Sequence, residues 1–263
     1  MDEHKVRTVL STLQSNPFDT SSWQELAEAL RTESSDSTDE SAESLLIAAR
    51  EKHAARGEHE AVNQLFELSC DLAEGTAAEV GLLVERAKVT LGELFDGQLA
   101  LRLLARAAEL APDNEQVARA ATLLREQAAG WETKAANYME EAENATDDAY
   151  RSAMLMRSAQ AEISFADQPR TEALVENLEV ALRLDPTNQP ATTLLESIYR
   201  KAGNDDGVIQ VLERAADRAH DPAFRTAAGV RLARIFLAEG NLASAALAYD
   251  RVLETEPTQS DAV

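Results

Sequence analysis

The stretch GNLASAALAYDRVLETEP, residues 240–257, decides the fold. It opens on Gly240, continues with Ala245 and Tyr249 at a spacing of four, and closes on Pro257. Residues three, four and seven apart share one face of a helix. Glycine tolerates the left-handed backbone of a turn, and proline stops a helix from continuing. The stretch therefore predicts a turn, one helix and a stop.

Looser copies of this phrase recur along the chain, which indicates an array of repeats. The clearest copies are NPFDTSSWQELAEAL (16–30), GQLALRLLARAAELAPDN (97–114), LVENLEVALRLDPTN (174–188) and LLESIYRKAGNDDGVIQVLERAADRAHDP (194–222). Two degenerate copies lie around Gly57 and Gly130. Small residues such as Ala107 and Ala245 allow two helices of a hairpin to approach closely. No single hairpin buries its apolar stripe alone, so neighbouring hairpins stack.

This succession resembles the tetratricopeptide repeat (TPR), whose pattern sets a tryptophan, a leucine and a tyrosine ahead of a small residue, an aromatic residue and a proline. In the last copy, Gly229 stands where the family has tryptophan, and Val252 stands where it has a second small residue. The resemblance implies an all-α, right-handed α-solenoid of about seven antiparallel helical hairpins. The helix pairs that we expect are 3–15 with 20–32, 41–56 with 58–74, 77–95 with 97–111, 114–129 with 131–145, 147–166 with 169–185, 188–202 with 204–219 and 222–239 with 241–256.

The same pattern gives the expected domain organisation. Residues 1–32 form an N-terminal hairpin, and 33–40 form an acidic, serine-rich linker or loop, because TESSDSTDES (32–41) has nothing to bury. Residues 41–257 form the TPR-like solenoid. Residues 258–263 open a further repeat, so we expect the chain to be the N-terminal region of a longer, bacterial-type protein.

Composition excludes several classes of function. The chain has 263 residues and a net charge of -22, from 25 basic and 47 acidic residues. A nucleic-acid binder needs basic charge, so we expect no nucleic acid and no anionic membrane surface as partner. No apolar run is long enough for a signal peptide or a bilayer span. The single cysteine, Cys70, precludes an intramolecular disulfide, which favours the cytoplasm.

The sequence carries no pattern typical of catalysis, so we expect no enzyme, no catalytic residues, no cofactor and no metal. His53 and His59 flank Gly57, but His53 falls on the apolar spacing of its helix, and the H-E-x-x-H zinc pattern is absent. Neither a glycine-rich phosphate loop nor a G-x-S-x-G turn occurs. The packing of Cys70 among apolar residues indicates a small buried group.

In TPR proteins the first helices of the hairpins line a concave groove that receives a peptide or a helix. On the corresponding helices of this chain, the candidate partner-binding residues are Arg200, Lys201, Arg231, Arg234 and, at the start of a second helix, Trp131. A basic cluster of this kind suits an acidic peptide or a carboxylate. The alternative is that the four basic residues pair with neighbouring glutamates and that Trp131 packs against its own hairpin.

These observations favour a non-enzymatic scaffold that binds a protein or peptide partner through the concave groove. One alternative is an acidic, chaperone-like or regulatory module for a basic protein, and another is a structural spacer in a larger assembly. Ionic strength separates the first two, because only the acidic module loses its affinity steeply with salt. The partner, the pathway and the oligomeric state stay open at the level of sequence.

Overall fold

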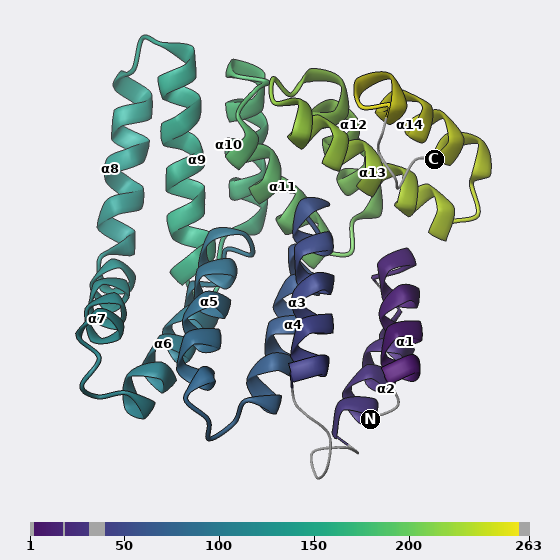
Figure 1. Cartoon of the computed structure of the whole chain (residues 1–263). Helices are drawn as coiled ribbons and strands as arrows, with labels where there is room; N and C mark the ends of the chain where they lie inside the picture. Colours follow the sequence, from purple (N-terminus) through teal and green to yellow (C-terminus); the bar gives the residue numbers. More distant parts are fainter. Residues whose placement is uncertain (1–2, 18, 32–39, 258–263) are drawn as a thin grey trace. The chain divides into compact units, whose positions relative to one another are not determined.

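A computed structural model of the chain describes residues 3–17, 19–31 and 40–257. Within these ranges it contains fourteen helices and no strand (Figure 1). The helices are α1 (Glu3–Ser15), α2 (Thr20–Arg31), α3 (Glu40–Ala55), α4 (His59–Leu72), α5 (Ala78–Gly92), α6 (Gly97–Leu110), α7 (Glu115–Ala129), α8 (Trp131–Asn144), α9 (Asp148–Phe165), α10 (Thr171–Leu184), α11 (Gln189–Lys201), α12 (Asp205–Arg218), α13 (Pro222–Ala238) and α14 (Leu242–Thr255). Contacts run mainly between consecutive helices, so the predicted all-α repeat solenoid is confirmed.

The glycine turns of three hairpins form as the sequence predicts. Gly57, Gly203 and Gly240 take positive φ angles of 68°, 66° and 75° between the two helices of their pairs. The asparagine after the last two glycines caps the next helix, since Asn204 accepts the N–H of Gly207 at 3.0 Å and Asn241 accepts that of Ser244 at 3.2 Å. Glycine ends the first helix and asparagine starts the second.

The junction at Gly130 differs from the expected hairpin of 114–129 with 131–145. Gly130 has φ −108° and ψ 11°, its N–H donates to the carbonyl of Glu126 at 3.2 Å, and its own carbonyl accepts the N–H of Lys134 at 3.1 Å. Helical hydrogen bonds therefore span this glycine, and no left-handed residue turns the chain. The chain reverses after α8, where Asp147 caps α9, and α8 packs beside α9 (Figure 1).

The described residues divide into two units. Unit 1 comprises Met1–Thr90 and Arg102–Ala121, and unit 2 comprises Leu91–Leu101 and Thr122–Val263. In unit 1, the apolar faces of α1 and α2 share one core with α3 and with Leu65 of α4. The first hairpin thus packs against the second. Residues 33–39 of the expected linker and residues 258–263 lie outside the described part, whereas Glu40 already belongs to α3.

Unit 2 has a core built from α8 to α12, into which the segment Leu91–Leu101 inserts its aromatic ring. The side chain of Phe95 is buried among residues of α9, α10 and α11, and its φ of 52° is unusual for a bulky residue. Lys201 donates from Nζ to the carbonyl of Leu94 at 3.0 Å. A β-carbon on Gly97 would come within 2.4 Å of the ring of Phe165, so only glycine fits there.

Candidate functional site: an open groove on α5 and α7

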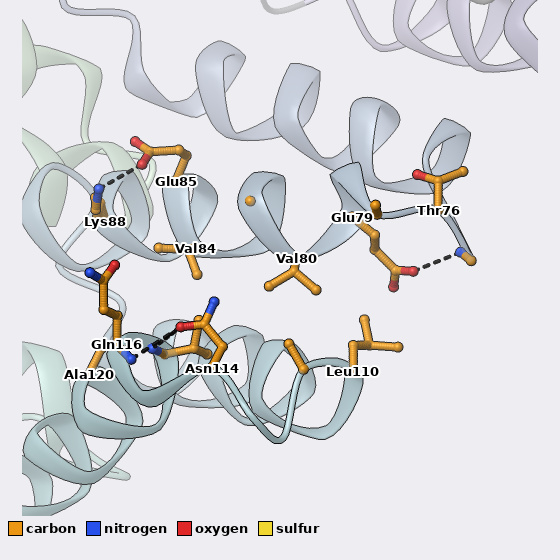
Figure 2. A pocket seen from close by; sticks show the side chains of 15 residues that line it. Thr76, Glu79, Val80, Val84, Glu85, Lys88, Leu110, Asn114, Gln116 and Ala120 are labelled. Atoms are coloured by element: carbon orange, nitrogen blue, oxygen red, sulfur yellow. Dashed lines mark hydrogen bonds and ion pairs between the residues drawn. The ribbon is translucent and has the colours of Figure 1, made fainter.

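A groove lies in unit 1 between α5 and the start of α7 (Figure 2). Its volume is about 870 Å³. The lining comes from the turn before α5, one face of α5, the end of α6 and the first turns of α7. These residues are Gly75, Thr76, Ala77, Glu79, Val80, Gly81, Val84, Glu85, Lys88, Leu110, Ala111, Asn114, Gln116, Val117 and Ala120.

One wall of the groove is an apolar stripe of α5. Val80 and Val84 are half-buried and point across the groove in Figure 2, and Gly81 between them is exposed. The adjacent face of α5 is buried through Leu83 and Ala87. The helix therefore carries apolar residues both on its buried face and along the groove. A β-carbon on Gly81 would meet no atom within 4 Å.

The second wall is the N-terminal part of α7 with the end of α6. The side chain of Asn114 accepts the backbone N–H groups of Gln116 and Val117 at 3.1 and 3.3 Å, which caps α7. Val117 is buried, whereas Leu110 keeps 36% of its surface exposed. A groove with aliphatic side chains on both walls and a capped helix end along one of them suits a peptide better than a small polar molecule.

A buried carboxylate shapes one end of the groove. Glu79 is 6% exposed, and its Oε2 accepts the backbone N–H of Gly75 at 2.8 Å, while Nε of Arg106 lies 3.8 Å from its Oε1. This contact fixes the turn that precedes α5. At the other end, Lys88 pairs with Glu85 at 2.6 Å on the exposed surface, as Figure 2 shows. The apolar stripe therefore lies between two charged ends.

The basic residues expected to bind a partner lie in unit 2, and two of them share one buried carboxylate. Glu196 of α11 accepts from Arg200 at 2.8 Å and from Arg231 of α13 at 3.0 Å. Burial opposes ionisation of Glu196, but the two guanidinium groups outweigh it and hold the pKa of this carboxyl below its usual value. Arg200 and Arg231 thus pair with a glutamate, which is the alternative to partner binding that the sequence left open. The glutamate is buried, whereas the sequence suggested pairs on a solvated surface.

The other three predicted residues have different surroundings. Lys201 holds the carbonyl of Leu94, and Arg234 is 9% exposed on α13. Trp131 begins α8 with its side chain partly exposed. The structure thus joins Arg200 to Arg231 through Glu196, and it places Trp131 on a different helix.

The residues considered for chemistry have structural partners. His53 is completely buried, and its Nδ1 lies 2.6 Å from Oε2 of Glu58 across the Gly57 turn. Burial is the main cause that raises the pKa of the Cys70 thiol to about 11. Within the ranges 3–17, 19–31 and 40–257, no three acidic, histidine or cysteine side chains gather as a metal site would require. In the same ranges no helix combines the length and apolar character needed to span a bilayer.

Sequence reasoning missed the groove along the helix expected at 77–95. Val80 and Val84 follow the same spacing as core residues, so the pattern alone predicts burial for both. The one available signal was Gly81, a glycine inside a helical pattern with no turn to make. That signal marks a position where α5 presents bare backbone to solvent.

Comparison with known families supports the repeat architecture. Residues 191–226, which cover most of α11, all of α12 and the start of α13, match the family model of the tetratricopeptide repeat. This match and the fourteen helices of the described residues fit a TPR-like repeat protein. No curated protein matches the chain. The TPR family generally serves protein–protein interaction and is generally non-catalytic.

Proposed function

We propose that this TPR-like repeat protein is a non-enzymatic scaffold, which binds a peptide or helix of a protein partner in the groove between α5 and α7. The observation that carries the proposal is the partly exposed stripe of Val80, Gly81 and Val84, which lines an open groove of about 870 Å³. Grooves between helices commonly receive amphipathic or extended segments. The partner is a protein and not a nucleic acid, since the chain has a net charge of -22.

The basic residues of α11 and α13 stay candidates for partner binding, of which Lys201 is exposed and Arg200 partly exposed, whereas Arg231 and Arg234 are buried. Arg200 and Arg231 both bind the carboxylate of Glu196, in a chain that is otherwise acidic. Lys201 and Arg234 lie on the same two helices. An acidic segment of a partner is the ligand that such a cluster favours. We place the protein in the cytoplasm, since its one cysteine cannot form an intramolecular disulfide.

Photo-crosslinking tests the proposal at the groove itself. A photoreactive p-benzoylphenylalanine replaces Gly81, whose side is open, and the intact chain is irradiated in an extract of its source cells. The control carries the same group in place of Gly92, which lies on the same helix outside the groove and also has open space. We expect a discrete protein adduct from position 81 that position 92 does not give.

Two outcomes contradict the proposed function. Identical adducts from positions 81 and 92 would show contact without a preference for the groove. If position 81 gives no protein adduct although circular dichroism shows that the chain is folded, the structural spacer is the better description. An adduct that disappears steeply with salt from both positions favours the acidic module for a basic protein.

A further inference from the structure

The groove between α5 and α7 also indicates the chemistry of its occupant. We propose that it takes a short segment of a partner protein with aliphatic anchor residues flanked by lysine or arginine. This inference rests on the proposed function, because it names the ligand of the same groove. It goes further in specifying the sign of the charge and the kind of side chain that the groove selects.

The length of the apolar stripe limits the segment. This wall of the groove runs from Ala77, just before α5, to Lys88 on α5, and a rise of 1.5 Å per residue makes this distance about 16 Å. That span matches about three turns of helix or about five extended residues. The aliphatic side chains available to it are Val80, Val84 and Leu110. Aliphatic anchors gain free energy there by removing apolar surface from water.

The charges beside the groove favour a basic segment. The stretches 74–88 and 106–120 contain six carboxylates and four basic side chains. Each of the four basic side chains already pairs with a carboxylate of this chain. These pairs are Arg86 with Glu67, Lys88 with Glu85, Arg106 with Glu79 and Glu109, and Arg119 with Glu115. Carboxylates are therefore in excess, and a basic flank finds partners where an acidic flank meets repulsion.

The charge of the whole chain acts in the same direction. A net charge of -22 attracts basic segments from a distance and repels acidic ones. This long-range attraction alone does not distinguish an apolar segment from a polar one. The discrimination comes from the groove, because a purely polar segment buries none of its own apolar surface against Val80 and Val84. Both properties together define the ligand class.

Calorimetric titration of the intact chain with three synthetic peptides tests the inference. The peptides have about eleven residues, enough to span the stripe as a helix. One alternates leucine and lysine in an amphipathic pattern, the second has glutamate in place of lysine, and the third has serine in place of leucine. We expect the leucine–lysine peptide to bind at least about tenfold tighter than either of the others.

Three variants at one position show whether binding occurs in the groove. Gly81→Arg and Gly81→Glu add side chains of similar length and opposite charge, and Gly81→Ala controls for the backbone. We expect the leucine–lysine peptide to bind Gly81→Arg about fivefold more weakly than Gly81→Glu at low salt. At about 0.5 M salt the difference shrinks, because exposed charges are screened. Arginine or glutamate in place of Gly92 should have little effect on peptide affinity, since that position lies outside the groove.

The remaining outcomes overturn the inference in distinguishable ways. If the leucine–glutamate peptide binds as tightly and responds to the Gly81 variants, the groove binds peptides and the inferred charge is wrong. If the serine–lysine peptide binds as tightly as leucine–lysine and ignores position 81, the attraction is general and not a property of the groove. If no peptide binds, the ligand class is wrong, and the crosslink from position 81 reports separately on the proposed function.

Discussion

Gly229 of α13 lies directly against Val252 of α14, and the valine side chain fills the space that a side chain at position 229 would occupy. A β-carbon on Gly229 would come within 2.6 Å of Cγ2 of Val252, which is closer than real atoms approach. Both residues are buried. The TPR pattern sets a large residue at the first position and a small one at the second, and here the sizes are exchanged. The departure from the family pattern at Gly229 is thus compensated on the neighbouring helix.

A double-mutant cycle should reveal this compensation. We expect Gly229→Ala to destabilise by about 1 kcal/mol, because overpacking outweighs the gain in helix propensity. Val252→Ala should cost about 2–3 kcal/mol through lost burial and a cavity. The double variant should lose less than the sum by about 1–2 kcal/mol, measured by urea unfolding. Strict additivity would show that the two side chains do not share one space.

We expect the buried ion pairs of Glu196 to contribute more to the free energy of unfolding than any exposed ion pair of the chain. Glu196→Gln leaves Arg231, only 8% exposed, without its charged partner, so we expect a loss of about 2–4 kcal/mol in unfolding free energy. Glu115→Gln is the control, since Glu115 pairs with Arg119 on the surface with both side chains largely exposed. Equal effects of the two variants would contradict the structural role of Glu196.

The same carboxylate predicts a difference in pH dependence. The folded pKa of Glu196 lies below its ordinary value of 4.5, because the attraction of two guanidinium groups exceeds the effect of burial. A lowered folded pKa contributes stability that is complete above the unfolded pKa and is lost as the pH falls through the folded one. Between about pH 6 and pH 3, the native chain should therefore lose more unfolding free energy than Glu196→Gln. Parallel curves in chemical unfolding would refute this.

Two glycines beside helix ends should respond in opposite ways to alanine. Gly203 has a φ of 66°, where a β-carbon is strained, so Gly203→Ala should destabilise by about 1 kcal/mol. Gly130 has a φ of −108°, and an added β-carbon would lie 3.4 Å from the carbonyl oxygen of Glu126. Gly130→Ala should be neutral or slightly stabilising in thermal unfolding. A strong loss at Gly130 would indicate that the chain does turn there.

Cys70 should react slowly in the folded protein. Burial raises the pKa of its thiol to about 11 from an ordinary value of 9.0. At pH 8 the fraction of reactive thiolate is therefore about 100-fold smaller than in the unfolded chain. Mass spectrometry after iodoacetamide treatment, with and without urea, measures the two rates. Similar rates in both conditions would mean that Cys70 is accessible.

The sequence predicted the elements whose signals are local. Gly203 followed by Asn204 predicts a turn and a helix cap, and the spacing of Leu195 and Tyr199 predicts an apolar helix face. The helices α11 and α12 therefore agree closely with their expected bounds. Gly130 misled because glycine at a helix end does not reveal its φ. The ion pair between Glu196 and Arg231 joins residues 35 positions apart in the sequence, so no local pattern predicts it. The groove depends on how α5 and α7 lie beside one another, which no local pattern records.

The course of the chain through its two units has a consequence for biosynthesis. The segment Leu91–Leu101 leaves the ribosome before the remaining residues of unit 2, although Phe95 belongs to their hydrophobic core. Until that core is made, this aromatic ring stays exposed on a nascent chain whose first ninety residues can already associate. No single proteolytic cut releases both units intact, because each is assembled from two separate portions of the polypeptide.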